Sequence, residues 1–97
     1  MKIIESKEYK VQVRNIALTI KKDKQQASIK FVKDLKKKIN GILNMPYKYR
    51  KSNYHNDENV RDMIFRGYTI IYKIYDEYIK IVEIFNKNLP VIKNISL

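Results

Sequence analysis

The chain has 97 residues, 44% of them hydrophobic, with two glycines, two prolines and no cysteine. This size fits one small domain with a single core, since about 60% of the unfolded surface becomes buried at such a length. The lack of cysteine excludes a disulfide framework and a thiolate metal site. A formal net charge of +11 predicts a polyanionic partner, either nucleic acid or an acidic protein segment. The alternative interpretation is that lysine only keeps the surface soluble.

The apolar residues are too dispersed for a membrane segment. No run reaches the roughly 18 residues that a spanning helix needs, and the N-terminus lacks the apolar core of a signal peptide. The sequence therefore predicts a cytoplasmic protein without membrane contact.

The first half of the chain predicts a short strand followed by two helices. Residues 2–5 are β-prone, and Ser6 is a suitable N-cap for a helix. An apolar stripe follows at helical spacing: Tyr9, Val13, Ile16, Ala17 and Ile20. Val11 and Leu18 lie on the other side of that helix, where they form either an interface or two ordinary exposed aliphatic residues.

The second helix is predicted from Lys24 to Asn40, with Asp23 as its cap and Asn40-Gly41 as its left-handed stop. Its apolar face consists of Ala27, Phe31, Leu35, Ile39 and Ile42. Lysines occupy the opposite face, which indicates a solvated surface. The two helices are expected to pair as an antiparallel hairpin.

The polar stretch from residue 44 to residue 59 interleaves basic and aromatic side chains. The basic residues are Lys48, Arg50 and Lys51, and the aromatic ones are Tyr47, Tyr49 and Tyr54. This pattern suits single-stranded nucleic acid, because cations hold phosphates while rings stack on bases. Alternatively, the rings pack on the domain and leave their hydroxyls in water.

Residues 60–86 predict three antiparallel strands joined by turns at Arg66-Gly67 and Asp76-Glu77. One predicted face is large and apolar: Met63, Phe65, Tyr68, Ile70, Tyr72, Ile74, Ile79, Ile81 and Phe85. The reverse face is smaller and carries charge: Val60, Asp62, Ile64, Thr69, Ile71, Lys73, Lys80, Val82 and Ile84. We expect the helices to cover the first face and to leave the second for solvent and partners. On this register Lys73 lies opposite Lys80, which suits a bound anion.

The predicted fold is α+β, with an N-terminal strand, an antiparallel two-helix hairpin and a three-stranded antiparallel meander in one domain. This pattern resembles the RelE/ParE superfamily of bacterial toxins. The resemblance is carried by "FVKDLKKKINGILNMPYKYRKS" and "NVRDMIFRGYTIIYKIYDEYIKIVEIFN", and it extends to about Pro90. It implies a growth-inhibiting toxin of a type II toxin–antitoxin system, neutralised by an acidic antitoxin. The target is then either messenger RNA on the ribosome, cleaved by a metal-independent RelE-like endoribonuclease, or DNA gyrase, bound by a ParE-like toxin.

The residues at the nuclease positions favour the ParE-like mode. RelE-like nucleases commonly place arginine after the tyrosine that opens the third strand and histidine or tyrosine near the C-terminus. This chain has Thr69 and Asn86 at these positions. Asparagine cannot act as a general acid. Other catalytic candidates are Arg61, Glu83 and His55, although Arg61 and Glu83 on one face also predict a plain ion pair and His55 a plain surface residue. No metal or other cofactor is expected.

Two groups of contact residues follow from the resemblance and the charge pattern. Candidates for nucleic-acid or target binding are Lys48, Arg50, Lys51, Arg66, Lys73, Lys80 and Lys87. Candidates for antitoxin binding are Val11, Leu18, Val82 and Ile84. Residues 91–97 form a C-terminal tail that either folds back or contacts a partner. The alternative function is a non-catalytic basic module that binds RNA or protein on the same fold.

Overall fold

The computed structural model describes residues 1–86 and confirms the α+β class, with the helices on one face of a single sheet. The elements in chain order are β1 (Lys2–Glu5), α1 (Lys7–Asp23), α2 (Gln25–Asn40), the 3-10 turn η1 (Gly41–Leu43), β2 (Arg50–Lys51), β3 (Val60–Phe65), β4 (Tyr68–Ile74) and β5 (Tyr78–Asn86). The predicted C-terminal tail lies outside the described residues.

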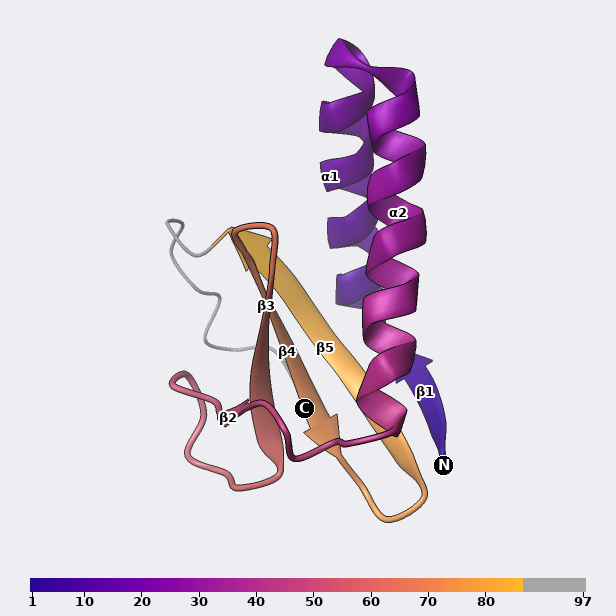
Figure 1. Ribbon diagram of the computed structural model, residues 1–97. Helices are drawn as coiled ribbons and strands as arrows, with labels where there is room; N and C mark the ends of the chain where they lie inside the picture. The colour runs from indigo at the N-terminus through magenta and orange to yellow at the C-terminus, as the bar shows by residue number, and fades with distance from the viewer. Residues whose placement is uncertain (87–97) are drawn as a thin grey trace.

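The sheet has five strands in the order β1-β5-β4-β3-β2. β1 pairs in parallel with β5, and the other neighbours are antiparallel. The two-residue strand β2 had no clear sequence signal. Figure 1 shows the two helices side by side near the β1 and β5 edge, with their connection pointing away from the sheet.

Both predicted turns are confirmed. Arg66 and Gly67 adopt φ angles of 49° and 83°, the left-handed pair that a tight hairpin turn needs and that glycine accepts at low cost. At the other end, the Tyr75 N–H donates to the Tyr78 carbonyl at 2.9 Å, which leaves only Asp76-Glu77 in the turn.

Ser6 joins the start of α1 to the sheet. Its hydroxyl accepts the Tyr9 N–H at 3.0 Å, as predicted for an N-cap, and donates to the Val82 carbonyl at 2.6 Å. β1 ends at Glu5, which pairs with Ile81, so within the described part of the chain the rest of β5 has no neighbouring strand on that side. Ser6 and then Gln12, which accepts the Ile84 N–H at 2.7 Å, satisfy backbone groups that would otherwise stay unpaired.

Helix α2 ends at Asn40 as predicted and begins one residue later than predicted, but the caps predicted for its two ends are wrong. Asp23 is the last residue of α1, and Lys24 occupies the N-cap without a side-chain hydrogen bond. Gly41 is right-handed, with φ −64°, and begins a further turn rather than a left-handed stop. That extra turn brings Ile42, which is fully buried, into the core. Apolar burial, worth roughly 1.5–3 kcal/mol for an isoleucine side chain, thus decides the backbone path.

One core fills the space between the helices and the sheet. The helical segment supplies the predicted stripe residues Tyr9, Phe31, Leu35, Ile39 and Ile42. The sheet supplies Met63, Phe65, Ile70, Tyr72, Ile74, Ile79, Ile81 and Ile84. The helical hairpin therefore covers the face that the sequence predicted, with one exchange in β5.

A β-bulge in β5 causes that exchange. Ile71 pairs with Glu83, whereas the next residue, Tyr72, pairs with Ile81, so Val82 is the extra residue. Beyond the bulge the alternation is inverted. Ile84 consequently belongs to the core under the helices and Phe85 to the reverse face, the opposite of the prediction.

The prediction of an uncovered reverse face is wrong for its centre. Val60, Ile71 and Val82 are fully buried in a second apolar cluster, against which Phe85 packs. Part of this burial comes from the β2–β3 loop, because the Tyr54 ring lies 5.3 Å from the Phe85 ring at a steep angle.

Lys73 and Lys80 are paired across β4 and β5 as predicted. They lie towards the end of the two strands that carries the Asp76-Glu77 turn, away from the buried centre of the face. Any anion attracted by this pair would therefore meet the margin of the sheet.

Candidate functional site

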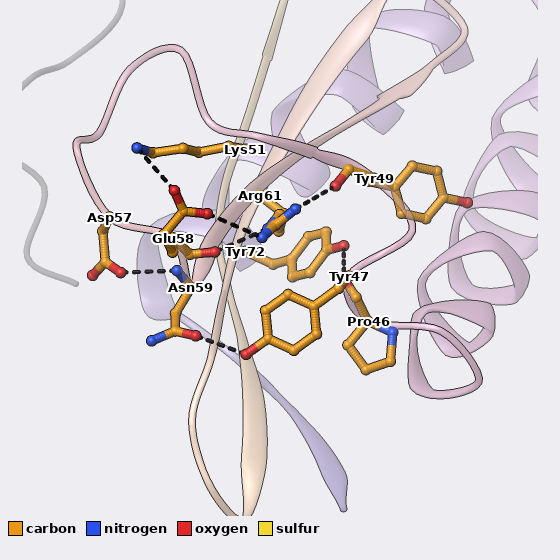
Figure 2. A network of polar contacts seen from close by, with 9 residues as sticks. All are labelled: Pro46, Tyr47, Tyr49, Lys51, Asp57, Glu58, Asn59, Arg61 and Tyr72. Carbon is orange, nitrogen blue, oxygen red and sulfur yellow. Dashed lines mark hydrogen bonds and ion pairs between the residues drawn. The ribbon is translucent and has the colours of Figure 1, made fainter.

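The loop that runs from Pro46 into β2 is anchored by Arg61 (Figure 2). The guanidinium donates to the Tyr49 carbonyl at 3.1 Å and to the Glu58 carbonyl at 3.0 Å, and it lies 3.5 Å from the Glu58 carboxylate. One side chain of β3 thus holds the loops on both sides of β2. Because it satisfies two backbone carbonyls, Arg61 is a positioning residue. The ion pair predicted between Arg61 and Glu83 is not formed.

Two tyrosines fix the same loop at its start. The Tyr72 hydroxyl donates to the Pro46 carbonyl at 2.6 Å, and the Tyr47 hydroxyl donates to Asn59 Oδ1 at 2.7 Å. Burial, with a smaller contribution from Tyr49, raises the pKa of Tyr72 well above its usual range. Tyr72 therefore stays protonated near neutral pH and acts as a hydrogen-bond donor.

Two lysines converge on the ring of Tyr49. Lys38 Nζ lies 5.8 Å and Lys48 Nζ 5.6 Å from the ring centroid, both within cation–π range. Lys48 was predicted as a contact residue, but Lys38 was missed because it belongs to the lysine run on α2. The available signal was its position in the last turn of that helix, only a short loop away from Tyr49.

The other basic residues of this loop are paired with carboxylates. Arg50 lies 3.5 Å from Asp62, whose side chain is fully buried, and Lys51 lies 3.3 Å from Glu58. Both cations remain about half exposed, at 51% and 42%, so they can still meet a ligand at the β2 edge.

The predicted catalytic residues do not form one site. Glu83 is 1% exposed on the reverse face, whereas Arg61 lies on the helix side of the sheet. Thr69, at the position of the nuclease arginine, is also 1% exposed. Asn86 ends β5 opposite Tyr68. His55 lines a hollow of about 500 Å³ in the β2–β3 loop.

Glu83 is unusual because it is buried without a cationic partner among residues 1–86. Burial, together with a smaller contribution from the charge of Asp62, raises the pKa of Glu83 to about 7. One oxygen of each of these carboxylates has no hydrogen-bond partner. The bulge is responsible for this position, since it turns Glu83 onto the same face as Asp62.

The remaining predicted cations are dispersed. Arg66 pairs with Asp34 and lies 5.0 Å from the Phe65 ring centroid. Lys73 lies 3.2 Å from Asp57. Lys87 is outside the described residues. Arg66 and Lys73 are thus each paired with a carboxylate away from Tyr49.

The predicted antitoxin contacts separate into two groups. Val11 and Leu18 are exposed at 46% and 52%, as a contact requires, whereas Val82 and Ile84 are buried at 0% and 1%. The side chains of Val82 and Ile84 therefore cannot meet a partner, which corrects that part of the prediction.

A different surface is hollowed along the junction of α1 and α2, here called the interhelical groove. It consists of three adjoining hollows of about 550, 130 and 380 Å³. The first two share Glu5, Lys10 and Lys36, and the last two share Val32. Its apolar lining comprises Ile3, Ile4, Tyr9, Val13, Ile29, Val32, Leu35 and Ile39, and its basic lining Lys10, Lys21 and Lys36.

Two further properties describe residues 1–86. None of their helices combines the length and apolar character needed to cross a membrane. They also contain no group of three or more His, Cys, Asp or Glu side chains placed to hold a metal ion.

These features define a small basic α+β protein with an anchored cationic loop and an apolar groove with basic residues along it. A family model described as "ParE toxin of type II toxin-antitoxin system, parDE" matches residues 3–88. The chain therefore belongs to the ParE toxin family, within the superfamily predicted from sequence.

Comparison with solved structures agrees with this fold. A chain from a structure titled "Chromosomal ParDE TA system from P. aeruginosa" matches with a TM-score of 0.72 and 11% identity, covering 89% of this chain and 95% of that chain. At this identity the similarity establishes the fold alone. A search of curated proteins gave no match.

Proposed function

We propose that this protein is a growth-arresting toxin that binds DNA gyrase and does not cleave RNA. The proposal is supported chiefly by Thr69, which occupies the position of the nuclease arginine and is 1% exposed. A buried threonine can neither touch phosphate nor stabilise its developing charge. The dispersed positions of Arg61, Glu83 and His55 support the same conclusion, because general acid–base catalysis needs its groups within reach of one substrate.

The target is tested by induction of the protein in a bacterium. Plasmid supercoiling and transcript integrity are followed in the same cultures. We expect loss of negative supercoiling before growth stops, with transcripts intact, and the Asn86→Ala variant should arrest growth as the wild type does. Cleaved transcripts with normal supercoiling would contradict the proposal, and no growth defect would favour a non-toxic binding module.

The interhelical groove is proposed as the antitoxin site. Apolar lining between lysines suits a segment that is apolar on one side and acidic on the other. The three hollows follow both helices, which matches a long binding segment rather than a compact ligand. This proposal moves the antitoxin site from the four residues predicted from sequence, Val11, Leu18, Val82 and Ile84, to the groove. A partner can reach the groove at Ile4 and Ile29, which are 38% and 55% exposed.

A matched pair of variants tests this site. Ile29 lines the groove and is 55% exposed, whereas Leu18 is 52% exposed and does not line it. The candidate antitoxin is the product of an adjacent reading frame that encodes a small acidic protein. Ile29→Glu should weaken its binding at least tenfold by calorimetry, while Leu18→Glu should change it less than threefold. Equal effects of the two variants would contradict the assignment.

A further inference from the structure

The cations around Tyr49 form a local concentration of uncompensated charge. Lys38 and Lys48 both lie within 6 Å of the same ring centroid, and within residues 1–86 neither forms an ion pair. Like charges held close together repel, and a bound anion relieves that repulsion. The surface around Tyr49 therefore favours the binding of a negatively charged group.

An exposed aromatic residue, Tyr47, directly precedes Lys48 in the chain. Tyr47 is 53% exposed, yet its hydroxyl is bonded to Asn59 and the Arg61 guanidinium lies 4.9 Å from its centroid. Its hydroxyl thus holds the ring in place (Figure 2), although about half of the residue is exposed. A fixed, accessible ring supported by a guanidinium is the kind of platform on which unpaired bases stack.

The nearby carboxylates are already compensated. Glu58 lies 3.3 Å from Lys51 and 3.5 Å from Arg61, and Asp62 lies 3.5 Å from Arg50. Their charges therefore oppose an approaching polyanion only weakly. Arg50 and Lys51 lie on β2, the last strand of the sheet, so the basic surface continues along an accessible edge.

We propose that Tyr47, Lys38 and Lys48 form a binding site for single-stranded nucleic acid. The lysines contact backbone phosphates, and Tyr47 stacks on a base. A duplex would use the lysines alone, because its bases are already stacked, and an acidic peptide would have no need of the Tyr47 ring. The site goes beyond the proposed gyrase target, since it gives the protein a direct contact with nucleic acid.

The test measures fluorescence anisotropy of labelled 12-nucleotide thymidine DNA, uridine RNA and a DNA hairpin duplex, with purified protein across a salt series. Lys38→Gln with Lys48→Gln should weaken single-strand binding roughly 10- to 30-fold at 0.1 M salt and reduce the logarithmic salt slope by about 1.4, the value for two phosphate contacts. Lys22→Gln with Lys33→Gln removes the same charge elsewhere on the helices and should change affinity less than threefold.

The stacking contact is tested at Tyr47. Tyr47→Leu should weaken single-strand binding roughly fivefold or more, whereas Tyr47→Phe keeps the ring and should remain within threefold of wild type. Circular dichroism confirms that each variant is folded. Equal losses in the two lysine pairs, no effect of Tyr47→Leu, or preferred binding of the duplex would overturn the proposal. Because no gyrase is present, such a result would leave the proposed target untouched.

Discussion

The burial of Glu83 is expected to make the stability of the folded protein depend on pH. Its carboxyl is buried, and its pKa is raised from 4.5 to about 7 in the folded protein. The folded state therefore favours the protonated form, and the stabilisation is fully present below pH 4.5 and is lost as the pH rises through 7. A shift of this size corresponds to at most about 3 kcal/mol, of which roughly 2 kcal/mol is lost between pH 5 and pH 8.

The substitution Glu83→Gln isolates this contribution, because glutamine resembles the protonated acid and does not titrate. Urea unfolding at pH 5 and pH 8 measures the free energy of unfolding for both proteins. We expect Glu83→Gln to be within about 1 kcal/mol of wild type at pH 5 and more stable by roughly 2 kcal/mol at pH 8. Glu77→Gln, in the exposed β4–β5 turn, is the control and should follow the wild-type profile. If the free energies of unfolding of wild type and Glu83→Gln changed by the same amount between pH 5 and pH 8, Glu83 would not be the source of the pH dependence.

Three further substitutions test how the loop and the sheet edge are held, each by the free energy of unfolding from urea denaturation. Ser6→Ala removes both the helix cap and the hydrogen bond to the Val82 carbonyl, and should lower the free energy of unfolding by about 1–2 kcal/mol. Ser6→Thr keeps a hydroxyl and should recover most of that loss. An unchanged free energy of unfolding in Ser6→Ala would contradict the role of Ser6 in both contacts. Arg61→Ala should cost roughly 2–3 kcal/mol and Arg61→Lys less, because lysine cannot reproduce the bonds to two carbonyls; equal effects would argue against the anchoring role. Tyr72→Phe should cost about 1 kcal/mol by leaving the Pro46 carbonyl without its donor, and a neutral result would show that water replaces the hydroxyl.

Local signals predicted much of the fold correctly. Ser6 is a cap because its hydroxyl can reach the third N–H of the following helix, and Arg66-Gly67 is a turn because glycine tolerates positive φ. Phe31 and Leu35 are buried as their helical spacing predicts. Each of these depends on residues within about four positions, so the sequence contains the information directly.

The errors arise where distant parts of the chain decide. The bulge at Val82 places Glu83 and Phe85 on the reverse face, and nothing in the alternating pattern of β5 marks one extra residue. Gly41 continues the helical path because Ile42 fits the core, which overrides the local preference for a stop.

The candidate site shows the same division. Lys48 and Tyr47 stood out as a basic and aromatic loop, but the partnership of Lys38 with Tyr49 exists only once α2 and the loop are folded together. Similarly, the interhelical groove is formed by side chains from three elements, β1, α1 and α2. A surface of this kind has no contiguous motif to find.

The most direct test of the proposed function is a supercoiling reaction with purified DNA gyrase, relaxed plasmid and ATP, into which the purified protein is titrated. The proposed function predicts that supercoiling is inhibited in proportion to the protein added, and that messenger RNA on translating ribosomes stays intact in a parallel reaction. Full gyrase activity together with cleaved messenger RNA would contradict it.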